Sequence, residues 1–293
     1  SSTQEGQIYI PEVNWAIGTA CVVLVLTFRS SANLASTYGV ATTGTMAITA
    51  VLFFVVARRH WKWSVWRAGA LTALFLAVDL SFFGANLVKI PTGGWFPLGV
   101  AAGVYVLMST WKRGRHNLAR ILQEESLPLD LFLQDITRRC PTRVPGTAVF
   151  MSSDPGGTPP VLLHHVKHNK VLHEKVVLVS VESEEIPQVP TRERVELKEM
   201  GQGFYQVIAH YGFMETPDVP LVLGSLATFG LQIQPMQTTF YLGRETLLAT
   251  GRSKMARWRK RLFIIMTRNA QPASAFFGLP PNRVVEMGAQ IQI

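Results

Sequence analysis

The sequence predicts a chain of two parts, an all-α membrane part with four transmembrane helices followed by a mixed α/β domain in the cytoplasm. Its 293 residues leave room for roughly two domains. Only 16% of the residues are charged, against roughly 25% in an ordinary soluble protein. The charges are also segregated: residues 1–111 hold six basic and three acidic side chains, and residues 112–293 hold the other 22 and 16. This segregation argues against one soluble globule, and the 48% hydrophobic content argues against disorder.

Four apolar stretches approach or reach the length of about 20 residues that a spanning helix needs. They cover residues 13–28, 35–57, 65–87 and 95–111, after a lead-in over residues 1–12. One such stretch could be a buried helix of a soluble protein, but four in succession with charged stops favour membrane spans. The first two spans are separated by only a few residues, so we expect them to form an antiparallel hairpin.

Basic residues mark the cytoplasmic side of a membrane protein under the positive-inside rule. The loop after the second span and the end of the fourth span are strongly basic, whereas the other side has only Arg29 and Lys89. Because four spans return the chain to the side on which it began, residues 1–12 and 112–293 are expected in the cytoplasm. Tryptophans sit near the predicted ends of the spans, where indole rings favour the interface: Trp61, Trp63, Trp66, Trp95 and Trp111.

The second span carries hydroxyl groups and small residues in addition to apolar ones. Gly39 and Thr43, and likewise Ala41 and Thr45, are four positions apart, a spacing that lets helix backbones approach closely. Close packing is the favoured interpretation of this pattern. The alternative is that the span lines a polar ion path, for which the candidates are Tyr38, Thr42, Thr43 and Thr45.

Asp79 lies near the middle of the third span and is the other ion-path candidate. A carboxylate at that depth costs about 3 kcal/mol on insertion scales, so it should face the bundle interior or water and find a partner or a proton. A structural hydrogen bond to a neighbouring helix is an equally good interpretation. The four spans contain no basic partner for Asp79, so a pairing charge would have to come from outside this chain.

Residues 112–293 alternate between helical and strand patterns. A helical linker is expected over residues 112–145, with short helices over 118–125 and 129–138. Apolar runs predict strands over 147–151, 176–181, 239–242 and 284–293, and a hairpin joins strands over 195–200 and 204–211. Helices are expected from Pro159-Pro160 to His168 and over 253–268. Strands separated by helices predict a mixed sheet with helical cover over residues 146–293.

Motifs for chemistry are lacking. Residues 154–160 lack the Gly-Lys-Ser/Thr ending of a phosphate loop and are better explained as a plain turn. His164 and His168 share a helix face but have no third metal ligand nearby, so a solvated helix is favoured over a metal site. Neither an enzyme nor a cofactor or metal is therefore predicted, and Cys21 and Cys140 are too few for a disulfide framework.

A basic segment over residues 252–261 is the densest charge feature. Its six cations have no acid among them: Arg252, Lys254, Arg257, Arg259, Lys260 and Arg261. Next to a membrane such a segment attracts anionic lipid. It could instead bind a nucleotide or an acidic partner, or form a solvated face that pairs with acids elsewhere in the fold. Nucleic acid is disfavoured, because the aromatic residues form no spaced stacking platform.

Particular motifs give the chain a family resemblance. Residues 6–15 (GQIYIPEVNW), 38–46 (YGVATTGTM) and 93–98 (GGWFPL) resemble the Kup/HAK/KT potassium uptake permeases, and residues 211–220, 239–247 and 280–286 are similar to their carboxy-terminal domain. The resemblance runs in order from Gly6 to Ile293. One departure is the Thr42-Thr43 pair, where bacterial members usually have Val-Thr.

The resemblance implies a potassium transporter of the inner membrane that is coupled to protons and built on inverted repeats, like other amino acid-polyamine-organocation transporters. The chain opens on Ser1 rather than methionine, so we expect it to be a piece of a longer protein, and the resemblance implies that this piece is the carboxy-terminal part, with the final four spans and the cytoplasmic domain. The principal potassium ligands would then lie in preceding spans, where broken helices meet near the midplane. The third and fourth spans could support a homodimer, and the cytoplasmic domain could bind a regulatory dinucleotide. The alternative function is a membrane-anchored cytoplasmic ligand-binding module.

Overall fold

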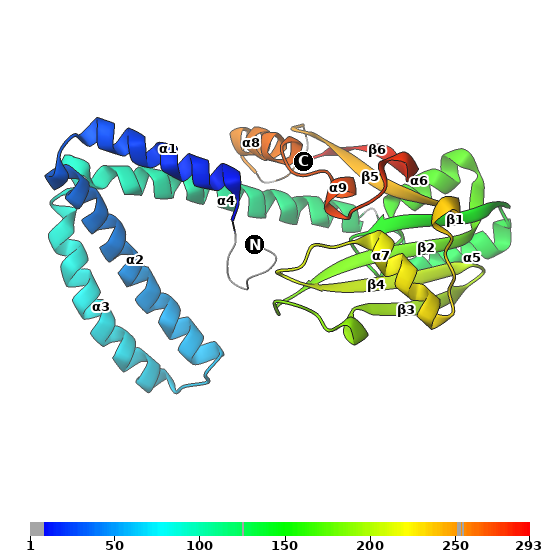
Figure 1. The fold of residues 1–293 in the computed structure, drawn as a ribbon, viewed down its shortest axis with the longest axis horizontal. Helices are drawn as coiled ribbons and strands as arrows, with labels where there is room; N and C mark the ends of the chain where they lie inside the picture. The colour runs from blue at the N-terminus through cyan, green and yellow to red at the C-terminus, as the bar shows by residue number, and fades with distance from the viewer. Residues whose placement is uncertain (1–8, 125, 251–252, 254) are drawn as a thin grey trace. The chain divides into compact units, whose positions relative to one another are not determined.

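The computed structural model describes residues 9–124, 126–250, 253 and 255–293. The chain divides into two compact units, Ser1–Ser109 and Thr110–Ile293. The first unit holds the apolar helices, and the second holds a sheet with its covering helices (Figure 1).

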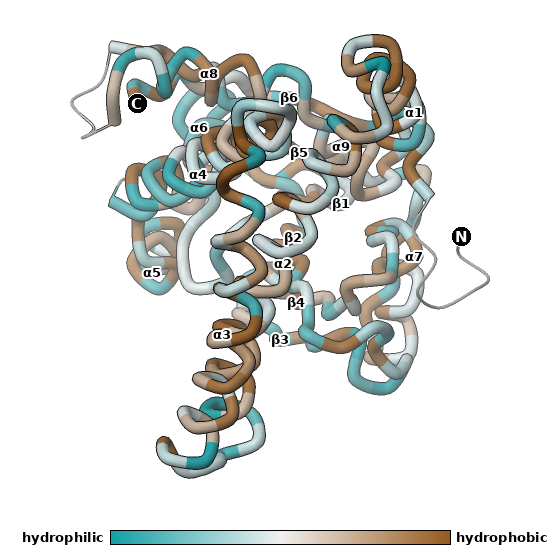
Figure 2. Tube along the Cα trace, turned by 90° about the vertical axis from the view of Figure 1, so that its left-hand side faces the viewer, coloured by the Kyte–Doolittle hydropathy of each residue, from teal (hydrophilic) through white to brown (hydrophobic). Residues whose placement is uncertain are grey.

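Four helices among the described residues are long and apolar enough to cross a membrane. They are α1 (Pro11–Phe28), α2 (Ser31–Arg59), α3 (Val65–Leu87) and the stretch formed by a π-turn at Ile90–Gly94 with α4 (Trp95–Glu124). The tube of α3 is hydrophobic over most of its length (Figure 2). The prediction of four apolar helices of spanning length is therefore confirmed.

Local chemistry explains where these helices begin and end. Arg29 takes a left-handed conformation, with a φ of 47°, and its N–H donates to the Val25 carbonyl, which ends α1. Ser64 begins α3, because its hydroxyl accepts a hydrogen bond from the N–H of Arg67. Each turn between spans therefore uses a polar side chain or a special backbone conformation rather than apolar residues.

The fourth helix is longer than its apolar part. α4 runs without a break from Trp95 to Glu124, so the separate helix predicted over residues 118–125 is wrong. No proline interrupts this stretch after Pro97, and Gly114 is buried, so nothing in the sequence breaks the helix where the apolar stretch ends. The expected short helix after Pro128 does form, as α5 (Leu129–Arg139).

The second unit contains a six-stranded sheet in the order β3-β4-β2-β1-β5-β6. The strands are β1 (Thr142–Ser152), β2 (Val171–Glu184), β3 (Val195–Gly201), β4 (Phe204–Gly212), β5 (Thr238–Leu248) and β6 (Val284–Gln292). All neighbours pair in parallel except β3 and β4, which form the predicted hairpin. The prediction of a mixed sheet is confirmed.

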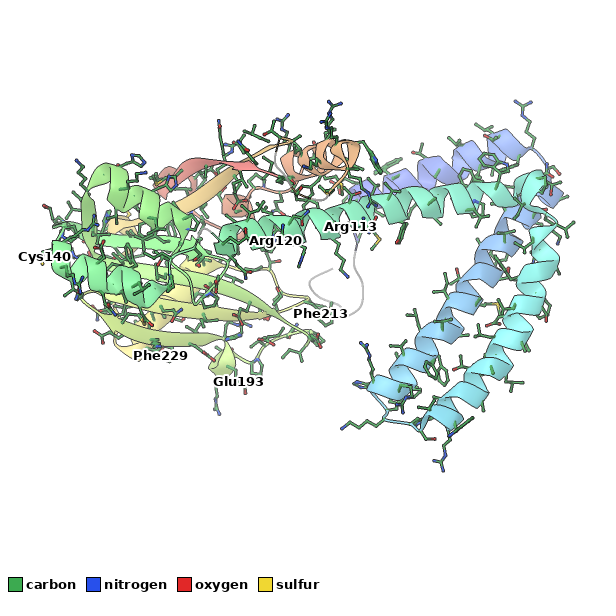
Figure 3. The ribbon with its side chains drawn as sticks, turned by 180° about the vertical axis from the view of Figure 1, so that it is seen from behind. Arg113, Arg120, Cys140, Glu193, Phe213 and Phe229 are labelled. Atoms are coloured by element: carbon green, nitrogen blue, oxygen red, sulfur yellow. The ribbon has the colours of Figure 1, made fainter. Side chains whose placement is uncertain are left out.

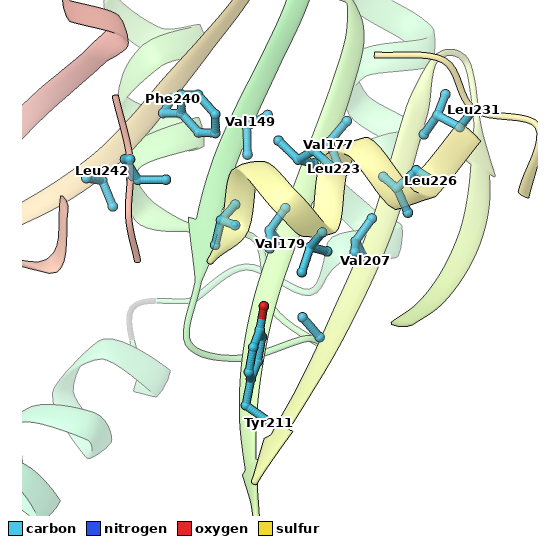
Figure 4. Packing of buried hydrophobic residues seen from close by; sticks show 14 residues of the cluster. Val149, Val177, Val179, Val207, Tyr211, Leu223, Leu226, Leu231, Phe240 and Leu242 are labelled. Atoms are coloured by element: carbon cyan, nitrogen blue, oxygen red, sulfur yellow. The ribbon is translucent and has the colours of Figure 1, made fainter. Parts of the chain in front are cut away.

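Helices cover both faces of this sheet. Strand residues alternate between the faces, so Val149 and Val177 pack under α7 (Val219–Ser225), while Ala148 and Val176 pack under α5 and α6 (Pro160–Asn169). Figure 4 shows the first of these cores, in which Leu223 and Leu226 lie over the valines of three strands. Two further helices complete the unit, α8 (Arg257–Arg268) and the short α9 (Ala273–Phe276).

Several other elements differ from the sequence prediction, among them β2 and β5, which extend beyond residues 176–181 and 239–242. β1 begins at Thr142 rather than at residue 147, because Gly146, with a φ of 102°, lets the strand continue through a register shift between Val144 and Thr147. The basic helix begins at Arg257 rather than at residue 253. α7 was not predicted, although Asp218 begins it by accepting a hydrogen bond from the N–H of Leu221.

Candidate functional site

The membrane unit brings α2 and α3 together as an antiparallel pair, seen side by side in Figures 1 and 3. Small residues permit this approach. A Cβ added to Gly39 would lie 2.8 Å from the side-chain oxygen of Asn86, and one added to Gly94 would lie 2.7 Å from Val40. The hydroxyl of Thr37 also donates to the carbonyl of Gly93 over 3.0 Å. The packing interpretation of the second span therefore holds at Gly39, whereas Ala41 and Thr45 line a groove.

A groove of about 610 Å³ lies along this helix pair. α2 contributes hydroxyl-bearing side chains to its wall, and α3 contributes Phe75 and Asp79. The polar side chains of the groove are Tyr38, Thr42, Thr45, Thr49 and Asp79. Four of the five sequence-derived ion-path candidates thus meet in one place, and Thr49 joins them.

Thr43 is the candidate that lies elsewhere. It is buried and is absent from the groove wall, and its hydroxyl donates to the carbonyl of Gly39 over 2.7 Å. On a helix, positions 42 and 43 point about 100° apart, so neighbouring threonines cannot share a face. Sequence reasoning could have separated them by this periodicity.

Asp79 is the one acidic side chain of the groove and is only 8% exposed. Within the part of the chain that the structure describes, its carboxyl group has no hydrogen bond or ion pair. Thr45 and Thr49 donate their hydroxyl protons to carbonyls one turn back, over 2.9 Å each. Their oxygens therefore remain available as acceptors. A carboxylate with nearby acceptor oxygens can hold a monovalent cation or carry a proton, which is the usual role of an acid at membrane depth.

The second unit has its own cavity, of about 520 Å³, at the carboxyl ends of its strands. β1 and β5 are neighbours in the sheet, yet the chain leaves β1 toward β2 on one side and reaches β5 on the other. In open α/β sheets ligands bind at such a switch point. Met151 and Ser152 line the cavity from β1, and Leu242 and Glu245 line it from β5.

The turn over residues 154–160, expected to be a plain turn, forms one wall of this cavity. Asp154 accepts a hydrogen bond from the N–H of Gly156 over 2.9 Å, and Pro159-Pro160 leads into α6. Thr158 is 1% exposed, and its hydroxyl oxygen has no hydrogen-bond partner among the described residues. A buried unsatisfied hydroxyl in a cavity wall marks a position where a ligand or water could bind.

Two opposite charges also line the cavity, Arg115 from α4 and Glu245 from β5. The Glu245 side chain keeps contact with solvent, but the protein packed around it raises its pKa, and the positive charge of Arg115 partly opposes that effect. The cavity therefore presents one cation, Arg115, beside the carboxylates of Asp154 and Glu245. The start of α6 adds little to it, because Pro159 and Pro160 have no N–H group and the N–H groups of Leu162 and Leu163 donate to the Pro159 carbonyl.

Histidines of the α6 region lie in two settings. His164 lines the cavity, and the rings of His164 and His168 are 5.9 Å apart. His165, on the buried side of α6, and His173, on β2, instead lie beside the ring of Tyr241, and burial lowers the pKa of both imidazoles. A group of described residues with the spacing of metal ligands lies elsewhere, on β2 and β4: Glu182, Glu184 and His210. Nδ1 of His210 is 2.8 Å from the carboxylate of Glu184.

The basic segment is only partly described. Arg252 and Lys254 lie outside the described residues, while Arg257, Arg259, Lys260 and Arg261 belong to α8. None of these α8 residues lines the cavity. Lys260 is buried, so it does not belong to the exposed cationic face.

Motif residues 211–218 serve the structure rather than a site. The Glu215 carboxylate accepts hydrogen bonds from the N–H groups of Gly212 and Val189 and pairs with Arg194. Burial alone would raise the pKa of Glu215, but these three partners together lower it. The N–H of Asp218 donates to the Tyr211 hydroxyl over 3.1 Å.

Comparison with known proteins covers both units. The family "K+ potassium transporter integral membrane domain" matches residues 1–116, and "K+ potassium transporter C-terminal domain" matches residues 145–293. The chain is 66% identical over 298 residues to "Probable potassium transport system protein Kup" of Anaeromyxobacter sp. (strain Fw109-5). It is 54% identical to a protein of that name from Myxococcus xanthus (strain DK1622) and 53% identical to Kup 2 of Syntrophobacter fumaroxidans (strain DSM 10017 / MPOB). All of this chain is covered in each case, but it spans only about 45% of the length of these relatives.

Proposed function

Because the chain belongs to the K+ potassium transporter family, matched in its integral membrane domain and in its C-terminal domain, we propose that the complete protein carries potassium into the cell with a proton. This chain would supply its carboxy-terminal part. The groove between α2 and α3 supports the proposal most directly, because it places an unpaired carboxyl group among hydroxyl oxygens at membrane depth.

Asp79 is the proton-carrying candidate of this groove. It lacks a basic partner in the described chain, and the neutral acid is far less costly at membrane depth than the ion. Protonation of Asp79 would therefore compete with cation binding at the hydroxyl oxygens beside it. The principal potassium ligands would lie in preceding spans, on broken helices of an inverted-repeat bundle, and those spans would close the open side of the groove.

The proposed orientation puts residues 1–12 and 112–293 in the cytoplasm and the multi-pass chain in the inner membrane. Exposed basic residues support it. Arg58 and Arg59 end α2, Lys62 lies in the turn that follows and Arg67 lies in the first turn of α3, while Lys112 and Arg113 lie on the turns of α4 that follow its apolar stretch. The exposed apolar surface of α3 and α4 could also serve a homodimer, as the family resemblance suggests.

Uptake of rubidium, a potassium substitute, tests the transport proposal. The complete protein is expressed in cells that lack their own potassium uptake systems, and rubidium entry is followed with and without a protonophore. We expect saturable uptake that the protonophore abolishes. Uptake that persists after collapse of the proton gradient would contradict coupling, and absence of uptake by inserted protein would contradict transport.

A second candidate function is regulation through the cavity of the cytoplasmic unit. The switch-point position, Arg115 and the unsatisfied hydroxyl of Thr158 favour a phosphate-bearing ligand such as a dinucleotide. Calorimetry of the whole chain in lipid nanodiscs with cyclic dinucleotides tests this idea. Residues 146–293 alone are unsuitable, because they cut β1 and omit Arg115. Heat of binding that disappears in Arg115→Gln is expected, and absence of heat for the unaltered chain would contradict the idea.

A further inference from the structure

α8 is cationic on its exposed side without being an ordinary solvated helix. Of its 12 residues, five are basic and none is acidic. Arg257, Arg261 and Arg268 have no acidic partner among the described residues. Solvated helices usually mix both signs of charge, whereas basic residues interspersed with large apolar ones are typical of helices that lie at a membrane surface.

One side of α8 is fixed to α4. Phe263 is fully buried, and its ring centroid lies 5.5 Å from that of Trp111. The same ring covers Gly114, where an added Cβ would lie 2.3 Å from it. α8 is therefore held against the first turns of α4 in the second unit.

The other side of α8 presents a mixed stripe to its surroundings. Trp258 and Ile265 are each 56% exposed, an unusual exposure for such large apolar side chains. They alternate with exposed Arg261 and Arg268 at spacings of three, four and three residues, which places all four on one helix face.

The contact with α4 lies close to the end of its apolar stretch. Trp111 and Gly114 follow Ser109, the last residue of the apolar unit, by two and five positions along one continuous helix. At 1.5 Å per residue, Gly114 is only about 8 Å farther along the axis than Ser109. The headgroup layer outside the hydrocarbon core is itself about 5–8 Å thick on each side. Lys112 and Arg113 are exposed on the same turns, and Figure 3 labels Arg113 on α4.

We propose that α8 binds the headgroups of anionic phospholipids in the bilayer that α1–α4 span. Arg257, Arg261 and Arg268 contact lipid phosphates, and Trp258 and Ile265 enter the interfacial layer. Each exposed basic residue near an anionic surface adds attraction, which falls off within a Debye length. The proposal depends on the membrane-spanning character of α4 and is independent of which ion is transported.

A nucleotide is the less suitable occupant of this face. The cavity of the cytoplasmic unit is lined by Arg115 and the start of α6, and none of the described α8 residues contributes to it. The stripe itself is convex and carries two large apolar side chains, which a lipid interface accepts and a free nucleotide does not require.

Depth-dependent fluorescence quenching tests the proposal. Cys21 and Cys140, both free and exposed, are first replaced by serine, and Ile265→Cys is labelled with an environment-sensitive fluorophore. The whole chain is placed in nanodiscs of phosphatidylcholine alone or mixed with phosphatidylglycerol, each with nitroxide-labelled lipid as quencher. Met236→Cys is the matched control, because Met236 is exposed in the short turn Pro235–Gln237 that precedes β5, at the end of this strand opposite the cavity.

We expect the label at position 265 to be quenched and blue-shifted in anionic nanodiscs, and the label at position 236 to be unaffected. The variant Arg257→Gln/Arg261→Gln/Arg268→Gln should lose the part of the quenching that depends on anionic lipid. Raised salt should cause the same loss of quenching in the chain that keeps its three arginines. This second measurement does not depend on the folding of the triple variant. Equal quenching in neutral and anionic nanodiscs, or none at position 265, would overturn the proposal.

Discussion

Asp79 has an environment that neither stabilises nor fully exposes its charge. It is 8% exposed, and its groove supplies hydroxyl oxygens but no cation. An ionised carboxylate at membrane depth without a partner costs about 3 kcal/mol. A position of this kind favours either a proton or a bound cation, which is the property expected of a residue that couples two ions.

Thr158 gives a direct test of the cavity in the second unit. Its buried hydroxyl has no partner among the described residues, whereas the equally buried hydroxyl of Thr238 donates to the Gln234 carbonyl over 2.7 Å. Valine has the shape of threonine without the hydroxyl. Thr158→Val should therefore leave the free energy of unfolding unchanged or raise it slightly, and Thr238→Val should lower it by about 1 kcal/mol. Denaturant unfolding of the chain in detergent measures both, and equal losses would show that Thr158 has a partner.

His165 and His173 predict how stability depends on pH. Burial lowers the pKa of both imidazoles, and a charge on His173 would lower that of His165 further. The unfolded chain, with an imidazole pKa of about 6.5, then binds more protons than the folded chain once the pH falls below that value. Stability should therefore decrease as the pH falls from about 7 to about 5.5.

Thermal unfolding of the chain at several pH values checks this prediction. His173→Gln should weaken the pH dependence, and the exposed His168→Gln serves as the matched control that leaves it unchanged. A pH dependence that is the same in both variants would assign it to other groups.

At the scale of elements, α4 and α8 pack closely at Gly114. Among the described helical glycines of the second unit, Gly114 has the least space for a side chain. A Cβ at Gly114 would lie 2.3 Å from the buried ring of Phe263, whereas one at Gly224 in α7 would have no atom within 4 Å. Gly114→Ala should lower the free energy of unfolding by about 2 kcal/mol through overpacking. Gly224→Ala should leave it unchanged or raise it slightly, because alanine is the better helix former. Chemical denaturation compares the two, and a neutral Gly114→Ala would mean that α8 is not held there.

The sequence predicted those elements whose signal is local. Apolar runs ended by Arg29 or Arg58 are visible as spans, and the Gly201-Gln202-Gly203 turn identifies the β3–β4 hairpin, where all three residues have a positive φ. The continuation of α4 past Trp111 and the extension of β1 back to Thr142 were missed. Both depend on partners distant in sequence, Phe263 for α4 and β2 for β1, which a local pattern does not contain.

The candidate sites were predictable to different degrees for the same reason. Asp79 stands out because a charge in an apolar stretch is a local signal, and helix periodicity places Thr42 and Thr45 on one face. The cavity of the second unit was missed, since Arg115, Thr158 and Glu245 come from three separate segments that only the fold of that unit brings together.

At the scale of the whole molecule, the two units differ in where their apolar side chains lie, because lipid surrounds the first unit and water surrounds the second. The described residues of the charge-poor first unit form helices whose apolar side chains are exposed to the surroundings, as a bilayer requires, while the charge-rich second unit buries its apolar residues on both faces of a sheet. The family match extends over both units, so membrane helices and sheet domain belong to one transporter architecture.

The pH dependence of rubidium uptake by Asp79→Asn tests the central claim most directly. The variant is made in the complete protein and compared with Thr72→Val, which alters a buried polar side chain of the same helix that lies outside the groove. We predict that both variants insert into the membrane, that Thr72→Val keeps the native pH profile, and that Asp79→Asn flattens it or abolishes uptake. Unchanged uptake kinetics at every pH in Asp79→Asn would contradict the claim and leave Asp79 with a structural role only.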